Sequence, residues 1–152
     1  MSATTKSGNG KQILISTFYL GETLMGIDTL CVQEVIRVIE MTAVFHAPEH
    51  ILGIINLRGR IVTIVDLARK LDLFQSQITE ESRIIIVQWN DEYVGLLVDR
   101  IHDAVYADRD NFIPPPPNIR ELQGRFLEGV YNADSHLMAI VDVDKVLADT
   151  DK

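Results

Sequence analysis

The chain is dominated by an alternation of apolar and polar positions with a period of two, rich in β-branched residues and broken by short turn signals. Such alternation is typical of strands that bury one face. It predicts four β-hairpins, at residues 11–28, 53–67, 83–99 and 125–142. Two further strands are predicted, at residues 40–46 and 101–108. The fold is therefore predicted to be mainly β.

Helical signals are few and short. A short helix is predicted after Asp28, where the chain then continues as a strand. Asp66 and Asp142 each precede a short amphipathic segment, and a carboxylate at that position accepts hydrogen bonds from the N–H groups of the first turn. Both are predicted helix N-caps. The polar residues 74–82 are predicted to form a loop between two halves of the chain.

The chain contains an internal repeat. Residues 53–71 and 129–147 align without a gap, and the matched positions include two glycines, two asparagines and the sequence Ile-Val-Asp. Composition alone gives roughly one or two identities in a window of this length. LMGID, at residues 24–28, likewise resembles YVGLL at residues 93–97. The repeat indicates a duplicated structural unit.

Each unit contains about five strands, enough for a small curled barrel. Two such barrels side by side would share a core and leave a groove between them, and binding sites favour such interfaces. We expect a flexible tail at residues 1–10 and a single domain at residues 11–150. Within this domain, subdomain one is predicted at about 13–80 and subdomain two at about 83–148.

The charge and the single cysteine restrict the function classes. With 14 Lys and Arg against 22 Asp and Glu, the net charge is −8, so phosphate groups would be repelled and nucleic acid is disfavoured as the main partner. Cys31 cannot form an intramolecular disulfide. No signal peptide or membrane-spanning run is visible. These observations favour a cytoplasmic protein without direct membrane insertion.

Sequence motifs for catalysis and metal binding are lacking. The chain has no phosphate-binding glycine loop, no nucleophile elbow and no HExxH motif, and its four histidines lack the spacing of zinc ligands. No catalytic residue, metal or cofactor is predicted. An enzymatic or small-ligand barrel stays as an alternative, and it would require a closed, polar-lined pocket.

Arg58, at the turn of the second predicted hairpin, is a candidate binding residue. The repeat places Asp134 at the corresponding turn, so the turn itself does not require arginine. The side chain could be a solvated cation, or a planar fork offered to a carboxylate or carbonyl of a partner. Glu34 has the same two interpretations, a solvated face or a contact. The Pro114–Pro117 run reads as a rigid spacer or a polyproline ligand.

Several segments together resemble the CheW family of chemotaxis coupling proteins: GIINLRGRIVTIVDL, GIDTLCVQEVIRV, VGLLVDRIHDAV and FLEGVY…MAIVDVDKVL. The resemblance extends from about Ile13 to Leu147. It implies two five-stranded SH3-like β-barrels related by a pseudo-twofold, with short helices. It also implies a non-catalytic adaptor that couples chemoreceptors (methyl-accepting chemotaxis proteins) to the histidine kinase CheA, in a flagellar or another chemosensory array.

The family also implies where partners bind. A groove between the subdomains would receive the helical cytoplasmic tip of the receptor, and other edges would contact the regulatory domain of the kinase. Matched by motif, the partner-binding positions are Arg58, Gly53, Val32 and Glu34, with Ile84 and Ala104 on the second-barrel side of the groove. The protein is expected to be a monomer outside receptor arrays. Thr63 departs from the family, which often has proline there.

Overall fold

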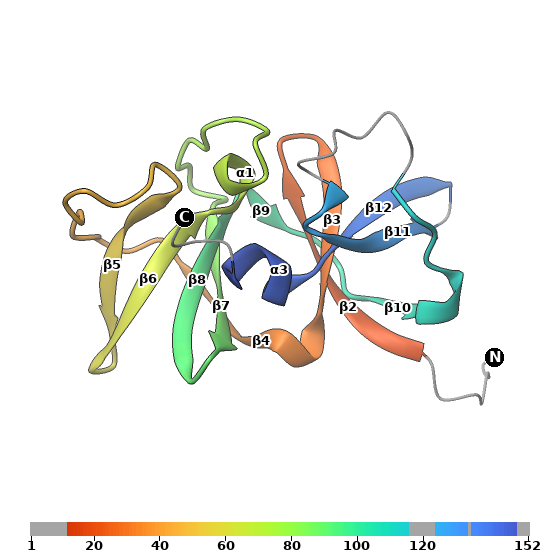
Figure 1. Ribbon diagram of the computed structural model, residues 1–152, viewed down its shortest axis with the longest axis horizontal. Coiled ribbons are helices and arrows are strands. Elements are labelled where there is room, and N and C mark those ends of the chain that lie inside the picture. The colour runs from red at the N-terminus through yellow and green to blue at the C-terminus, as the bar shows by residue number, and fades with distance from the viewer. Residues whose placement is uncertain (1–11, 116–123, 134, 149–152) are drawn as a thin grey trace.

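The computed structural model describes residues 12–115, 124–133 and 135–148, which form two sheets side by side (Figure 1). The first sheet has the strand order β4 (Val32–Arg37), β7 (Arg83–Trp89), β8 (Glu92–Val98), β6 (Arg60–Asp66) and β5 (Ile51–Leu57). The second has the order β10 (Val105–Asp108), β2 (Gln12–Leu20), β3 (Thr23–Asp28), β12 (His136–Val141) and β11 (Leu127–Ala133), with β9 (Arg100–Ile101) paired to β2. The described helical segments are η1 (Thr29–Cys31), α1 (Leu67–Lys70), η2 (Arg109–Asn111) and α3 (Val143–Ala148).

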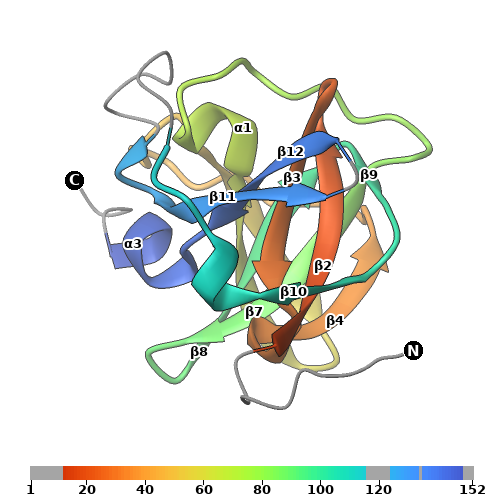
Figure 2. The ribbon, with the colours of Figure 1, turned by 90° about the vertical axis from the view of Figure 1, so that its right-hand side faces the viewer.

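Each sheet curls so that its two edge strands come close together. The segment that follows one edge strand, β4 or β10, then bonds to the other edge strand, β5 or β11. In the first sheet Thr42 and Ile54 exchange two backbone hydrogen bonds, of 2.9 and 2.8 Å. In the second sheet Ile113 and Val130 do the same, at 2.9 and 2.8 Å. We term the two closed sheets the first and second barrel, and Figure 2 shows how the strands of the second wrap around its interior. The predicted fold of two small β-barrels is confirmed.

The two barrels do not follow the predicted division into contiguous subdomains. The first barrel takes β7 and β8 from after residue 80, and the second takes β2 and β3 from the start of the chain. The exchange occurs because β6 pairs in parallel with β8, and β12 pairs in parallel with β3. Each barrel therefore contains a hairpin from the other half of the chain, and the same strand order results in both.

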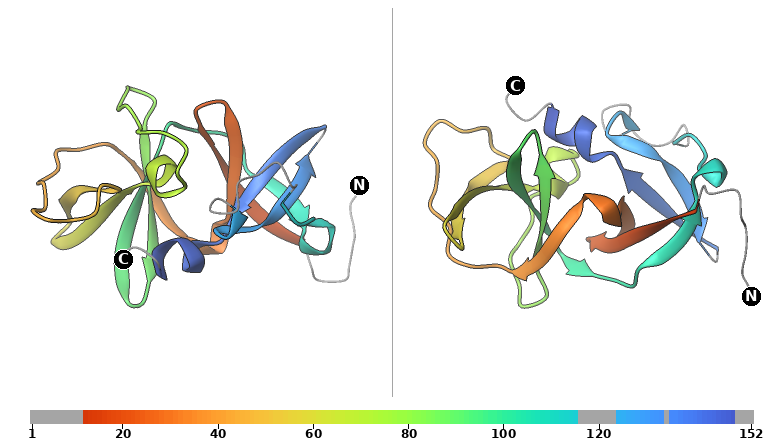
Figure 3. Two further views of the ribbon diagram at one scale, coloured as in Figure 1. Left: turned by 45° about the horizontal axis from the view of Figure 1, so that its top comes forward. Right: turned by 90° about the horizontal axis from the view of Figure 1, so that it is seen from below.

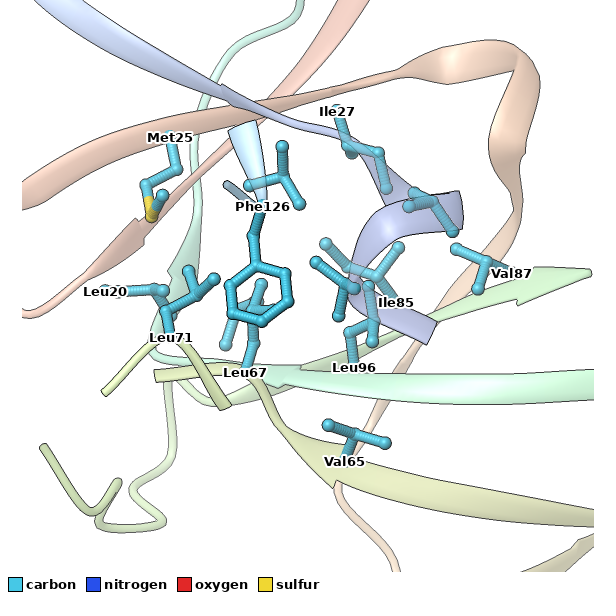
Figure 4. Close-up of a cluster of buried hydrophobic side chains, with 14 of the residues drawn as sticks. Leu20, Met25, Ile27, Val65, Leu67, Leu71, Ile85, Val87, Leu96 and Phe126 are labelled. Atoms are coloured by element: carbon cyan, nitrogen blue, oxygen red, sulfur yellow. The ribbon is translucent and has the colours of Figure 1, made fainter. Parts of the chain in front are cut away.

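Three hydrophobic clusters explain why the exchanged hairpins are apolar on both faces. Along β7, Ile84 and Ile86 point into the first barrel, whereas Ile85 and Val87 join a cluster between the barrels. Figure 4 shows this shared core, where Leu20 and Met25 of the second barrel meet Leu67 and Leu71, which follow β6. A strand buried on both faces reads as a continuous apolar run. Burial between the barrels joins them into one body.

Two glycines keep the barrel interiors closely packed. Gly26 in β3 and Gly95 in β8 are the positions that the repeat aligns, and both are buried. A Cβ at Gly26 would lie 2.4 Å from Ile15 Cγ2, and one at Gly95 would lie 2.6 Å from Ile64 Cδ1. The interiors of these small barrels have no room for another methyl group at this level, because isoleucine side chains, and Met138 in the second barrel, already fill them.

The predicted short helices and the hairpins are confirmed. Asp66 caps α1 by accepting from Arg69 N at 3.3 Å, and Asp142 caps α3 by accepting from Lys145 N at 3.2 Å. Both helices lie at the junction of the barrels (Figure 3, left). The loop predicted at residues 74–82 is also confirmed.

Two strand predictions were wrong. Residues 40–46 form an irregular segment in which only Thr42 makes a β-bridge, and the strand predicted at 101–108 is interrupted at residues 102–104. Both segments leave a barrel edge, where the neighbouring strand offers few backbone partners. The predicted tail at 1–10, Asp134, Pro116 and Pro117 lie outside the described residues.

Candidate partner-binding site

Arg58 occupies the tip of the β5–β6 hairpin. Arg58 and Gly59 have φ angles of 52° and 84°, so this two-residue turn has positive φ at both central positions. That geometry matches the twist of the flanking strands but is uncommon for arginine. Asn56 Oδ1 accepts from Gly59 N at 2.9 Å, and the repeat partner Asn132 accepts from Ser135 N at 3.1 Å. The asparagine, which the two halves share, supports the turn, and arginine is left free for another contact.

The guanidinium group of Arg58 is paired with the carboxylate of Glu34 in the same chain. Arg58 Nη1 donates to Glu34 Oε2 at 2.6 Å, and Nη2 donates to Oε1 at 2.9 Å. These bonds hold the pKa of the Glu34 carboxyl below its ordinary value and raise the pKa of Arg58. The two predicted binding residues, 24 positions apart, thus form one bidentate pair between β4 and the hairpin tip. Neither one is an isolated solvated charge.

Gly53 lies where the first barrel closes and is buried. A Cβ on Gly53 would lie 2.6 Å from Thr42 O, the carbonyl that accepts from Ile54 N. The aligned Gly129 faces the closing segment of the second barrel, with Phe112 Cβ 3.0 Å and Ile113 O 3.1 Å from an added Cβ. Both glycines pass beneath a closing bridge, so Gly53 makes its close backbone approach to another segment of the same chain.

The other predicted positions differ in exposure. Ile84 is fully buried inside the first barrel, so its prediction as a contact residue is wrong: β7 is a central strand, and this side of it faces the barrel interior. Val32 is half-buried against the shared core. Ala104 is exposed in the 102–104 link between β9 and β10. Val32 therefore lies at the junction of the barrels, Ala104 lies on the surface of the second barrel, and Ile84 does not reach the surface.

Large apolar side chains are exposed at this junction, and sequence reasoning missed them. Leu30 in η1 is 91% exposed, Tyr106 in β10 is 65% exposed, and Val35 and Ile101 are more than 40% exposed. We term these four residues the junction face. Within an apolar run such as LCV, sequence alone cannot separate an exposed leucine from a core one.

Strand register explains why these side chains gather. Tyr106 is opposite Leu14, and Ile101 is opposite Phe18, on the face of β2 that carries the shared core. Val35 is opposite Ile85, whose side chain also belongs to that core. Residues opposite one another in an antiparallel pair share a face. Tyr106, Ile101 and Val35 therefore lie on the same strand faces as the shared core, at places where those faces reach the surface.

Hydrogen bonds fix the segments that carry the junction face. Ser16 Oγ lies 2.6 Å from Thr29 Oγ1, which attaches η1 to β2. His102 N donates to Thr17 O at 2.9 Å, and Thr17 Oγ1 donates to Asp103 O, which attaches the 102–104 link. Polar contacts thus hold two irregular segments beside an apolar surface.

The described residues include no group of three or more His, Cys, Asp or Glu side chains placed to hold a metal ion. Among the helices of these same ranges, none is long and apolar enough to cross a membrane.

Comparison with known proteins identifies the family. The CheW-like domain matches residues 3–151. A probable chemotaxis protein CheW from Rhizobium etli is 30% identical over 99% of this chain and 97% of its own length. The chemotaxis protein CheW of Rhizobium meliloti is 34% identical over 91% of this chain and 88% of its own. The crystal structure of the scaffolding protein TtCheW from Thermoanaerobacter tengcongensis superposes with a TM-score of 0.80, at 33% identity, over 91% of both chains. The chain therefore belongs to the CheW family.

Proposed function

We propose that this protein is a non-catalytic chemotaxis adaptor that couples the cytoplasmic tips of chemoreceptors to a CheA-type histidine kinase. The observation that carries the proposal is the match to the CheW-like domain over nearly the whole chain. The adaptor would act in the cytoplasm, bound to arrays of membrane receptors, and would be a monomer outside them. The alternative of an enzymatic or small-ligand barrel is not favoured by this family.

The junction face is the proposed docking surface for the receptor. A receptor tip is a helical structure, and an amphipathic helix binds by laying apolar side chains against an apolar surface. Leu30, Val35 and Tyr106 supply such a surface across both barrels. Exposed apolar residues gathered on a soluble protein mark interaction sites. Binding here would therefore be driven mainly by apolar burial.

The Arg58–Glu34 pair is the proposed kinase-facing site. Along β4, Val35 faces the junction, whereas Glu34 is opposite Ile86, which points into the first barrel. The pair therefore lies on a different side of β4 from the junction face. The exposed charges, with Arg58 68% accessible, would give specificity for a complementary charge on the kinase. A partner carboxylate would have to share or replace Glu34 in the arginine fork.

The shared core gives the two proposed surfaces a fixed relation. Side chains from both barrels pack in one cluster, and close-packed interiors transmit displacement because they have low compressibility. A shift of the receptor tip on the junction face would therefore move the Arg58–Glu34 edge as part of the same body. Coupling in this proposal is geometric and needs no chemical step.

The kinase-facing role is tested by Arg58→Asp in an assay of receptor-dependent kinase stimulation, using receptor signalling fragments, the kinase and ATP. We expect the variant to stay folded, because the repeat carries aspartate at the matching turn, and to lose at least about tenfold in stimulation. Arg69→Asp removes a half-buried arginine that is likewise paired with a glutamate, Glu49, at 2.9 Å, and serves as the control. Stimulation by Arg58→Asp equal to wild type would refute the role of this pair.

The receptor-facing role is tested by Leu30→Ser, with binding to the receptor fragment and to the kinase measured separately by calorimetry. Leu30 contributes almost no burial to the free protein, so the fold should be unaffected. We expect weaker receptor binding and unchanged kinase binding. Leu137→Ser, at a 55% exposed leucine near the tip of the β11–β12 hairpin, is the matched control. Equal receptor affinities for wild type and Leu30→Ser would contradict the junction face.

A further inference from the structure

Within the described residues the chain crosses between the barrels twice, and the first of these crossovers is a single turn, η1, which leads from β3 of the second barrel into β4 of the first (Figure 1). We term this turn the inter-barrel crossover. It contains Leu30, the most exposed residue of the junction face. Its backbone begins with a cap, since Asp28 Oδ1 accepts from Leu30 N at 2.9 Å. The position of Leu30 is therefore tied to the carboxylate of Asp28.

Arg109, in η2 of the second barrel, holds that carboxylate from the other side. Arg109 Nη2 donates to Asp28 Oδ2 at 3.0 Å, and Nη1 lies 2.5 Å from Glu128 Oε2 in β11. One guanidinium thus connects β11, η2 and the end of β3. Through Asp28, this chain of bonds continues to the backbone of Leu30. A planar fork can reach two carboxylates at once, which the single ammonium of lysine does less well.

Burial of the two carboxylates distinguishes this contact from an ordinary surface ion pair. The side chains of Asp28 and Glu128 are 18% and 24% exposed, so water screens them less than fully exposed carboxylates. A cavity of about 280 Å³ adjoins them, with Cys31 and Gln88 on its first-barrel side. Asp142 and Asp144 also line this cavity, and Arg109 is the one cation among its described lining residues. Without Arg109, several carboxylates would face one another across the crossover.

We infer that Arg109 is a positioning residue that clamps the inter-barrel crossover and thereby sets the pose of Leu30 for its helical receptor partner. The clamp itself follows from the contacts around Asp28, whereas its effect on receptor binding rests on the proposed function. Arg109 acts through Asp28 and does not itself belong to the junction face. Loss of the clamp should loosen η1 without removing any apolar contact of the three cores.

The clamp is tested first without any partner, by measuring the reaction of Cys31 with a thiol reagent. Cys31 is the single cysteine of the chain and belongs to η1, so its reactivity reports directly on the crossover. For each variant, the reaction rate of Cys31 is divided by the fraction of its thiol that is ionised, which is taken from a titration of that variant. We expect this corrected rate to rise several-fold in Arg109→Gln. Arg69→Gln, which removes the fork from an ion pair outside the crossover, should leave the rate unchanged.

The second measurement is the affinity of Arg109→Gln for the receptor fragment and for the kinase. We expect about a five- to tenfold loss toward the receptor, no change toward the kinase, and an intermediate loss for Arg109→Lys. If Arg109→Gln does not fold, Asp28→Asn takes its place in both measurements, because it keeps an oxygen to cap Leu30 N but loses the charge that Arg109 holds. An unchanged Cys31 rate would overturn the clamp.

A failure of the proposed receptor surface and a failure of the Arg109 clamp give different results. If Leu30→Ser binds the receptor fragment normally, the proposed receptor surface is wrong, whereas the Cys31 rate still decides whether Arg109 clamps the crossover. If the Cys31 rate rises but receptor affinity stays at the wild-type value, Arg109 does not position Leu30 for docking, and that part of the inference is refuted.

Discussion

Gly53→Ala distinguishes a glycine needed for folding from a glycine that contacts a partner. The added Cβ would lie 2.6 Å from Thr42 O, 3.1 Å from Thr42 C and 3.3 Å from Met41 Cβ. The closest atoms belong to the backbone, which cannot rotate away as a side chain can. The closing segment must therefore move outward, and the two hydrogen bonds between Thr42 and Ile54 must lengthen.

The expected cost can be worked out from these contacts. Overpacking of this kind typically costs about 1–3 kcal/mol. Two weakened backbone hydrogen bonds add about 1 kcal/mol in all, because Thr42 is exposed and water replaces part of each bond. We therefore expect Gly53→Ala to lower the free energy of unfolding by about 2–4 kcal/mol. For a chain of this length that is a fall in Tm of roughly 4–16 °C.

Gly129→Ala is the matched control, since Gly129 has the same place in the second barrel. Its nearest contacts, at 3.0 and 3.1 Å, are looser, and we expect a cost of about 1–2 kcal/mol. Urea unfolding followed by the fluorescence of Trp89, the single tryptophan, measures both values. The contrary result would be a free energy of unfolding for Gly53→Ala within about 0.5 kcal/mol of the wild-type value, together with weak binding to the kinase. Gly53 would then be a contact residue, and the structural explanation would be refuted.

The two helix caps and one half-buried acid, Glu128, give further predictions. Asp66 is fully buried and also accepts from Ser76 N at 3.0 Å and Ser76 Oγ at 2.7 Å, so Asp66→Ala should cost about 2–4 kcal/mol in urea unfolding. Asp142→Ala removes a simpler cap and should cost about 1 kcal/mol; equal losses would contradict the added role of Ser76. Burial raises the pKa of Glu128 above its usual value of about 4.3, although Arg109 opposes the shift. Between that value and the raised pKa the folded protein binds more protons than the unfolded chain, so the contribution of Glu128 to stability falls as pH rises. Glu128→Gln should therefore gain stability relative to wild type as pH is raised from 4 to 7, and a relative loss over this range would show that the ion pair with Arg109 dominates.

Local pattern determined the elements of this fold. The period-two runs predicted the hairpins, and Asp66 and Asp142 predicted where two helices begin. Both predictions succeed because strand alternation and N-cap chemistry involve only neighbouring residues. The internal repeat also predicted the two barrels. The segments that failed, residues 40–46 and 101–108, lie where the chain leaves a barrel edge, and such departures depend on which strands are nearby.

Pairing between distant strands was decided only by the tertiary structure. Two equal halves can pair within themselves or exchange hairpins, and the local pattern of a hairpin such as residues 83–98 is the same in both cases. In the folded protein β7 and β8 join the first barrel, which buries Ile84 and turns Val35 toward the junction. For the same reason sequence could name Ile84 as a contact residue and overlook Leu30.

The candidate site shows the same limit. Sequence selected Arg58 and Glu34 as separate charges, because their types and motifs are local properties. Their pairing at 2.6 Å, and the clamp from Arg109 to Asp28 across 81 positions, arise only when the closed barrels bring these side chains together. Sequence alone thus determined the building units and the family, whereas the long-range strand pairing decided which side chains are buried, which are paired and which face a partner.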